Sequence, residues 1–185
     1  TAGTYFALSV TDEDPFRGDE IKYCTWKYTH KGGFYWAGSY ASGDYLVFGS
    51  DDGSTEGNYT NTSILYSVST STGMMLDKLT GLKGDIRTSV SYSSGYVYFA
   101  TKGGYLYRVK MNPDGTFGQV LSYDLGGMAT ATPLVYKGRI YMGVCGHGGQ
   151  FNPDGGHHFD VIQESDSALS LAYSIPIAGY PQAAP

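Results

Sequence analysis

The sequence has few charged residues and no concentration of positive charge. Lys, Arg, Asp and Glu make up 16% of the 185 residues, and 12 basic against 17 acidic side chains give a formal net charge of −5. Nucleic acids are bound by basic stripes or patches, and anionic membranes attract polybasic segments. The composition therefore argues against a nucleic-acid partner and against an acidic membrane surface.

Long apolar runs are also missing. No segment approaches the roughly 20 apolar residues that a membrane-spanning helix needs, so we expect no membrane insertion. No export signal is visible either, but the chain begins at Thr1, as a mature or trimmed product would.

Cysteine is scarce, with only Cys24 and Cys145, both in apolar, strand-like surroundings. We expect two buried free thiols. A disulfide is the alternative, although the two residues fall in repeats that should not be adjacent. Two cysteines say little about the redox compartment.

Helical periodicity is absent, and the residues that are abundant favour strands. Hydrophobic residues make up 41% of the chain, with 27 Gly and 18 Tyr. Many aromatic residues and glycines beside few charges are typical of a compact all-β domain, and this much apolar material argues against disorder.

The main signal is an internal repeat. A glycine-containing turn followed by a strand of large residues occurs at 42–49, 94–100 and 137–143. Phe48, Phe99 and Met142 are equivalent, so the repeat recurs after 51 and then 43 residues, the first interval being lengthened by a polar insertion at 51–62. A period in this range is typical of a four-stranded propeller blade.

The remaining strands follow the same order in each repeat. Inner strands are predicted at 35–40, 88–92 and 131–136. Third strands are predicted at 5–8, 65–68, 106–109 and 159–162, and outer strands at 21–28, 75–80, 120–125 and 169–175. Because the first predicted strand is a third strand, the chain opens inside a blade.

These strands predict an all-β partial β-propeller of about three and a half four-stranded antiparallel blades. The predicted division is a half blade at 1–28, blades at 29–80, 81–125 and 126–178, and a stub of the next blade at 179–185. In 96–99 neither alternate set of side chains is polar, as expected for a sheet with neighbours on both sides. Propellers close with typically 4–8 blades, so the end blades should expose apolar faces. We expect the chain to be part of a larger ring, or to self-associate to cover those faces.

The repeat resembles the PQQ-like β-propeller repeat. The resemblance lies in 95–101, 103–107, 67–69 and 72–73, and it covers nearly the whole chain. That family includes quinoprotein dehydrogenases and a non-enzymatic outer-membrane assembly lipoprotein. The glycine-rich stretches 126–128, 149–151 and 155–158 resemble repeat regions of secreted or surface proteins of Gram-positive bacteria. The resemblance thus implies a non-enzymatic, extracellular or cell-surface protein of bacterial type.

Departures from that family argue against its chemistry. Quinoprotein catalysis uses adjacent cysteines and a Ca²⁺ near the cofactor, and this chain has no Cys-Cys pair. Of the blade-docking tryptophans, only Trp26 is in place, whereas Asp77 and Tyr173 stand at equivalent positions. Nucleophile elbows, phosphate loops and dinucleotide fingerprints are also absent. We therefore expect no enzyme activity, no catalytic residues and no PQQ.

Two groups of residues are candidates for ligand binding. Tyr35, Trp36 and Tyr40 would form an aromatic platform for a sugar or peptide, or else pack between blades. Asp85 and Arg87 precede an inner strand near one mouth of the predicted ring, where they would meet a ligand or form a structural salt bridge.

Metal binding is a further hypothesis. His147, Asp154, His157 and His158 lie in a glycine-rich hairpin and include imidazoles suited to Zn²⁺. The alternative is a loop with one histidine packed and another solvated, since His157 and His158 point to opposite faces of a strand. The oxygen-rich loop 51–58 could hold Ca²⁺, but it lacks a calcium-loop spacing and is otherwise a solvated loop.

Together these features predict a non-catalytic binding or scaffold module of an extracytoplasmic protein, whose loops contact a protein or a glycan. The alternatives are a degenerate quinoprotein-type redox enzyme fragment and a purely structural spacer. Fold alone does not choose among them, because propellers serve both binding and catalysis.

Overall fold

The computed structural model of the chain describes residues 2–11, 14, 16–19, 22–54, 58–146 and 155–185. These residues form fourteen β-strands. Within them, no helix is present that could cross a membrane. The predicted all-β class is confirmed.

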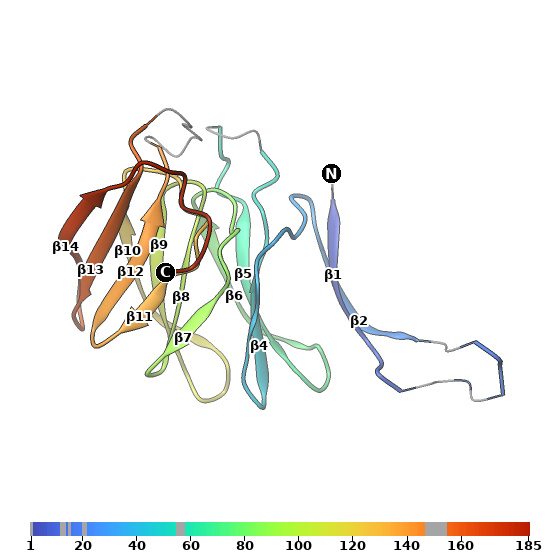
Figure 1. The fold of residues 1–185 in the computed structure, drawn as a ribbon. Helices are drawn as coiled ribbons and strands as arrows, with labels where there is room; N and C mark the ends of the chain where they lie inside the picture. The colour runs from blue at the N-terminus through green and yellow to red at the C-terminus, as the bar shows by residue number, and fades with distance from the viewer. Residues whose placement is uncertain (1, 12–13, 15, 20–21, 55–57, 147–154) are drawn as a thin grey trace.

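Twelve of the strands form three antiparallel sheets of four strands (Figure 1). The first contains β3 (Tyr40–Ala41), β4 (Tyr45–Gly49), β5 (Ser63–Ser69) and β6 (Met75–Leu82). The second contains β7 (Ser91–Ser93), β8 (Tyr96–Ala100), β9 (Tyr105–Met111) and β10 (Phe117–Asp124). The third contains β11 (Leu134–Tyr136), β12 (Arg139–Val144), β13 (His158–Glu164) and β14 (Leu169–Pro176).

The remaining two strands, β1 (Gly3–Leu8) and β2 (Cys24–His30), pair with each other. In Figure 1 the pair lies on the opposite side of the molecule from β14. In every sheet the strands are neighbours in chain order, so each sheet is a simple meander. The arrangement is that of partial propeller blades.

Two-residue turns explain why two of the three inner hairpins form where the sequence places them. Ser94 and Gly95 join β7 to β8, and Lys137 and Gly138 join β11 to β12. All four residues have positive φ, between 50° and 87°. A turn with two left-handed residues matches the right-handed twist of the flanking strands, which makes it a favoured hairpin connection.

The inner strands are shorter than the sequence predicted. Instead of 35–40, 88–92 and 131–136, only the last residues of each predicted segment belong to β3, β7 and β11. The earlier residues hydrogen-bond to the neighbouring repeat. Gly38 N–H donates to Ser89 Oγ at 3.0 Å, and Ser89 N–H donates to Thr132 Oγ1 at 3.0 Å. Backbone groups satisfied in this way do not need a partner in their own sheet.

Each complete sheet has apolar neighbours, and the second sheet shows this on both of its faces. Val97 and Phe99 of β8 pack with Leu65 of the first sheet, whereas Tyr98 of the same strand packs with residues of the third sheet that include Met142. All of these side chains are buried. The predicted absence of a wet face is confirmed for this sheet.

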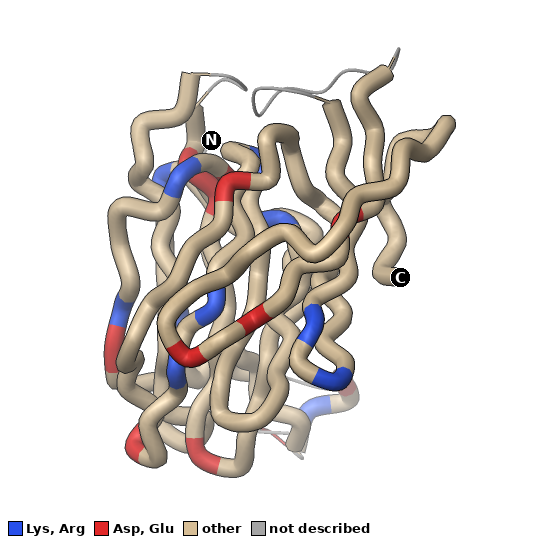
Figure 2. The backbone as a smooth tube through the Cα atoms, turned by 90° about the vertical axis from the view of Figure 1, so that its left-hand side faces the viewer, with Lys and Arg blue, Asp and Glu red and all other residues tan. Residues whose placement is uncertain are grey.

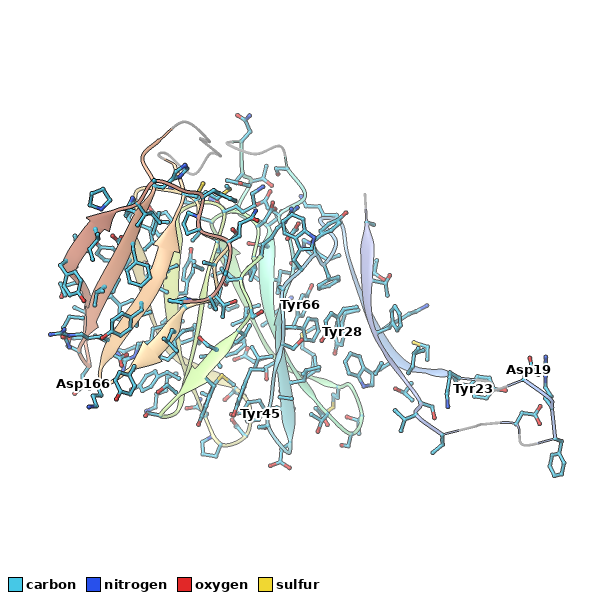
Figure 3. The ribbon with its side chains drawn as sticks, in the orientation of Figure 1. Asp19, Tyr23, Tyr28, Tyr45, Tyr66 and Asp166 are labelled. Carbon is cyan, nitrogen blue, oxygen red and sulfur yellow. The ribbon has the colours of Figure 1, made fainter. Side chains whose placement is uncertain are left out.

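Aromatic side chains join β1 and β2 to the first sheet. The rings of Tyr5 and Phe48 are stacked with centroids 4.0 Å apart, and Figure 3 shows Tyr28 and Tyr66 between β2 and that sheet. Tyr28 Oη also donates a hydrogen bond to Gly73 O at 2.6 Å. Trp26 covers Gly73 so closely that a Cβ there would lie 2.1 Å from the indole Cγ. Gly73 is therefore required by the docking of this tryptophan.

The predicted burial of the two cysteines is confirmed for Cys145 and wrong for Cys24. Cys24 and Cys145 form no disulfide with each other, and Cys145 is buried as expected, but Cys24 is exposed. Cys24 lies at the start of β2 in the two-stranded sheet, where its partner is Leu8 of β1. Leu8 is itself half exposed, so this end of the sheet lacks the cover that an interior sheet would give it.

Candidate functional site

Segments from four successive repeats surround one cavity. It has a volume of about 360 Å³ and is lined by Trp36, Arg87, Ser89, Thr130, Thr132 and Gln182. Trp36 precedes β3, Arg87 and Ser89 precede β7, Thr130 and Thr132 precede β11, and Gln182 follows β14. We call this space the inner cavity, because it lies where the segments leading into the innermost strands converge.

A repeated backbone contact directs Arg87 and Thr130 into the inner cavity. Ile86 N–H donates to Ser50 O and Ala129 N–H donates to Thr101 O, each at 3.2 Å. The next residue in each repeat is the one that lines the cavity. The same position in successive blades thus supplies Arg87 and then Thr130.

Trp36 lines the cavity with a strongly exposed side chain, 76% of whose surface is accessible. Its φ is 50°, a left-handed backbone that large side chains seldom adopt. The Arg87 guanidinium lies 4.9 Å from the Trp36 ring centroid and 5.0 Å from that of Tyr35. A cation over an aromatic face is attracted by the ring quadrupole, so Arg87 helps to hold both rings.

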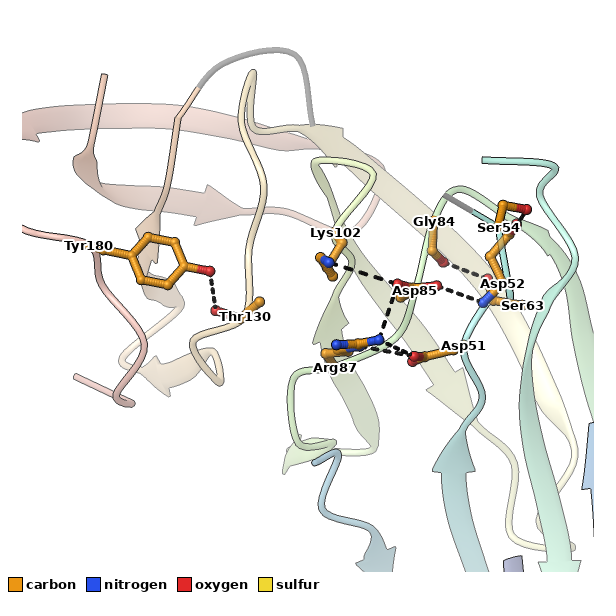
Figure 4. A network of polar contacts seen from close by, with 10 residues as sticks. All are labelled: Asp51, Asp52, Ser54, Ser63, Gly84, Asp85, Arg87, Lys102, Thr130 and Tyr180. Carbon is orange, nitrogen blue, oxygen red and sulfur yellow. Dashed lines mark hydrogen bonds and ion pairs between the residues drawn. The ribbon is translucent and has the colours of Figure 1, made fainter. Parts of the chain in front are cut away.

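Carboxylates in turn hold Arg87 (Figure 4). Its Nε and Nη2 donate to Asp51 Oδ2 at 2.9 and 2.7 Å, and Nη2 lies 3.6 Å from Asp85 Oδ2. Asp85 also accepts a hydrogen bond from Asp52 N–H at 2.9 Å and lies 4.0 Å from Lys102 Nζ. The positive charge of Arg87 is therefore offset on the side away from the cavity.

Asp51 and Asp52 are both buried but differ in their hydrogen bonds. Asp52 accepts bonds from Thr60, Thr62 and Ser54. Although burial acts against the charged form, these bonds lower the pKa of Asp52. Asp51 Oδ1 has no hydrogen-bond partner within the described part of the chain. Burial raises the pKa of Asp51 to about 6, in spite of the hydrogen bonds from Arg87.

The raised pKa of Asp51 predicts a pH dependence of stability. A carboxyl that holds its proton more tightly when folded stabilises the protein fully below its unfolded pKa, near 3.8, and this stabilisation is lost as the pH rises through about 6. The Asp51→Asn variant does not titrate there. We expect the unfolding free energy of the wild type, minus that of the variant, to fall by about 3 kcal/mol between pH 3.5 and 7.5. Urea unfolding of both proteins at several pH values measures this difference. A difference that stayed level, or rose with pH, would contradict the assignment.

The structure brings some of the predicted binding residues together and separates another. Tyr35, Trp36 and Arg87 form one group, and Asp85 makes the salt bridge that was the alternative for it. Tyr40 stacks on Tyr92 with centroids 4.5 Å apart and packs against a core cluster. A binding role for the group stays a prediction.

Sequence reasoning missed several members of the site: Asp51, Ser89, Thr130, Thr132 and Gln182. A signal for some of them was present in the repeat. Once Arg87 is a candidate, the equivalent position in the next repeat is Thr130, and in the stub it is Gln182. Asp51 has no such signal, because its contact with Arg87 spans 36 residues.

The predicted metal ligands are only partly described. His147 and Asp154 lie outside the described residues. His157 is buried, and its Nδ1 accepts a hydrogen bond from Gly146 N–H at 3.3 Å. His158 Nε2 lies 3.4 Å from Asp160 Oδ2. No group of three or more metal-ligating side chains occurs in the part of the chain that the structure describes. Metal binding by this hairpin therefore stays a prediction.

The oxygen-rich loop is described except for residues 55–57. The Asp52 carboxylate already accepts hydrogen bonds from Thr60 and Thr62, and Asp51 binds Arg87. These two carboxylates thus have contacts of their own in the loop, and calcium binding there remains untested.

Comparisons with known proteins give a fold but no family. No protein-family model and no curated protein matches the sequence. Among solved structures, the chain is similar to BamB from Moraxella catarrhalis, with a TM-score of 0.53 and 16% identity over 93% of this chain and 46% of BamB. It is also similar to the computationally designed Ika8 protein, with a TM-score of 0.52 and 16% identity over 80% of this chain and 38% of Ika8.

The chain is a partial β-propeller. It spans less than half the length of either of these structures. The inner cavity of this propeller segment thus lies on the side where the inner strands of a ring face the ring axis.

Proposed function

We propose that this propeller segment is a non-catalytic binding module that contacts another protein through the inner cavity. The observation that carries the proposal is the exposed indole of Trp36 beside a polar cavity of about 360 Å³. Interface energy concentrates in a few residues, and Trp and Arg are enriched among them. A volume of this size accommodates one or a few side chains of a partner.

The chemistry of the lining favours an uncharged segment of the partner. Ser89, Thr130, Thr132 and Gln182 offer hydroxyl and amide groups, and Arg87 is neutralised by Asp51 and Asp85. The Ser89 and Thr132 hydroxyls already accept hydrogen bonds from backbone N–H groups, which holds them in fixed positions. Fixed polar groups around one exposed ring serve binding specificity, because less side-chain freedom is lost when the partner docks.

A glycan is the second candidate. The same lining of hydroxyl groups, one amide and one indole face suits a sugar ring, which has polar edges and apolar faces. We further propose, from the resemblance of its glycine-rich stretches, that the segment belongs to a secreted or surface-exposed bacterial protein.

The proposal is tested by selecting peptides from a phage-displayed library against the purified chain and by probing a glycan microarray in parallel. We expect a selected peptide whose affinity falls at least tenfold in Trp36→Ala, since a buried anchor residue is worth at least that much. Calorimetric titration measures this affinity. Phe16→Ala, in the exposed loop between β1 and β2, serves as the control and should leave it unchanged.

Binding only on the glycan arm, with the same dependence on Trp36, would favour the second candidate. Binding on neither arm, or binding that Trp36→Ala leaves intact, would refute a role for the inner cavity.

A further inference from the structure

One face of the last sheet is apolar, and it is open along β14, whereas Val161 of β13 is buried. The strand registers place Tyr173 opposite Val161, which pairs with Tyr141, and place Ile175 opposite Phe159. These side chains share the face directed away from the second sheet, because Met142 and Ile162 on the other face pack against that sheet. Tyr173 is 45% exposed and Ile175 49%.

Equivalent positions in the first two sheets are covered by the sheet that follows. Leu79 pairs with Leu65, and Tyr123 pairs with Leu106, as Ile175 pairs with Phe159. Leu79 packs into the core between the first and second sheets, and Tyr123 into the core between the second and third. The last sheet thus carries the apolar surface of an interior blade without the neighbour.

At the other end of the molecule, β1 exposes side chains whose equivalents in the later sheets are buried. Phe6 and Leu8 of β1 are equivalent to Tyr66 and Val68 of β5, which are buried. In the second sheet the same positions, Tyr107 and Val109, are also buried. Phe6 is 54% exposed and Leu8 50%, although their neighbours Tyr5 and Trp26 pack on the first sheet. The face of β1 that would meet a preceding blade is therefore open.

The β1–β2 pair and the segment after β14 also correspond to different strands of one blade. β1 and β2 correspond to a third and an outer strand. The segment after β14 is placed like an inner segment, because a Cβ on Gly143 would lie 2.3 Å from Pro181 Cβ, just as one on Gly49 would lie 2.4 Å from Ile86 Cγ2. Gln182 then reaches the inner cavity, as Arg87 does after Ile86.

We propose that a second copy of this chain covers both faces, with the open face of the last sheet of each copy packing against the β1–β2 face of the other. The two faces lie at opposite sides of the molecule (Figure 1), so the contact is head to tail, and such contacts make a ring when the rotation closes. The chain spans 46% of BamB, so two copies match the length of one such structure. Two copies give eight blades, of which six are complete sheets of one chain and two are shared between the copies, within the range of known rings.

Each open face carries a basic side chain beside its apolar ones. Figure 2 shows Lys and Arg interspersed with Asp and Glu over the face it displays. On the two open faces themselves, Lys27 and Thr29 lie beside Phe6 and Thr4 at one end, and Arg139 and Gln163 lie beside Tyr141 at the other. Each face thus combines half-exposed apolar side chains with polar ones, as protein interfaces do.

Sedimentation velocity of the 185-residue chain tests the proposal. We expect a dimer of two 19.9 kDa chains. Phe6→Lys and Ile175→Glu alter one face each at half-exposed positions, and circular dichroism checks that both variants remain folded. We expect each variant alone to weaken the dimer at least tenfold. Val10→Lys, at an exposed site in the loop after β1, serves as the matched control and should stay dimeric.

An equimolar mixture of Phe6→Lys and Ile175→Glu decides the arrangement. A head-to-tail ring formed by the two variants has one unaltered contact, and its other contact joins the new lysine to the new glutamate, so we expect the mixture to regain the dimer. A symmetric contact between two last sheets would respond to Ile175→Glu alone and would overturn the proposal. A wild type that sediments as a monomer would also overturn it and leave these faces to further blades of a longer chain. Neither result bears on ligand binding in the inner cavity, which Trp36→Ala tests separately.

Discussion

The Arg108→Met variant is expected to unfold with a free energy about 3–5 kcal/mol lower than that of the wild type. Arg108 of β9 crosses from the second sheet to the third. Its Nε lies 3.3 Å from Glu164 Oε2, and its Nη1 donates to Ser165 O at 2.5 Å. The guanidinium also covers the Tyr96 ring at 3.7 Å from the centroid. The side chain is only 6% exposed.

The expected loss of stability is large because the Glu164 carboxylate is left without its cationic partner. Methionine fills much of the volume of the arginine stem, so the variant removes the cation and its hydrogen bonds without a large cavity. Glu164 keeps the hydrogen bond that Tyr98 Oη donates at 2.7 Å but loses its positive partner. Burial and Glu164 raise the pKa of Tyr98, so its hydroxyl stays protonated and continues to donate. An unpaired carboxylate between two packed sheets is costly.

A double-mutant cycle separates this cause from lost packing. Adding Glu164→Gln to Arg108→Met removes the stranded charge, so we expect the double variant to lose at least about 1 kcal/mol less than the sum of the single variants. Arg17→Met is the control, because Arg17 pairs with Asp19 on the surface, where an ion pair contributes little. Urea unfolding followed by circular dichroism measures all four. Additive losses, or an Arg108→Met loss equal to that of Arg17→Met, would contradict the role given to the pair.

Features that recur locally were predictable from the sequence. The Ser94-Gly95 and Lys137-Gly138 turns predict inner hairpins at these places, because a glycine beside a second left-handed residue fits few other structures. The run from Val97 to Phe99 is apolar at every position, and the structure buries it on both faces. The propeller could be predicted because these local signals repeat at a fixed period.

Features that depend on contacts between repeats were not predictable in detail. The segment around Trp36 was expected in a strand, but Gly38 bonds to Ser89 of the next repeat, and Trp36 is left in a loop at the inner cavity. Likewise, no residue near Asp51 in the sequence indicates that Arg87 is its partner. The residues at the centre of the candidate site are therefore brought together by packing between repeats, which the strand pattern of one repeat does not predict.

The Gly49→Ala variant is expected to lose about 3 kcal/mol of stability, at the upper end of what overpacking a core costs. A Cβ on Gly49 would lie 2.4 Å from Ile86 Cγ2. Ile86 is fully buried in the core between the first two sheets, and its N–H donates to Ser50 O, so it has no room to retreat. Neither glycine in this comparison, Gly49 or Gly143, has a positive φ, so steric fit decides the result.

Gly143→Ala is the matched variant, at the same position of the last repeat, where the added Cβ would meet Pro181 at 2.3 Å. Pro181 belongs to the terminal segment after β14, and proline has no N–H to bind the preceding repeat as Ile86 does. A terminal segment that moves aside relieves the clash at low cost, so we expect a loss below about 1 kcal/mol. Thermal and urea unfolding of the two variants give the comparison. Equal losses would mean that the terminal segment is held as firmly as an interior blade, and two small losses would mean that the sheets slide apart more readily than their packing implies.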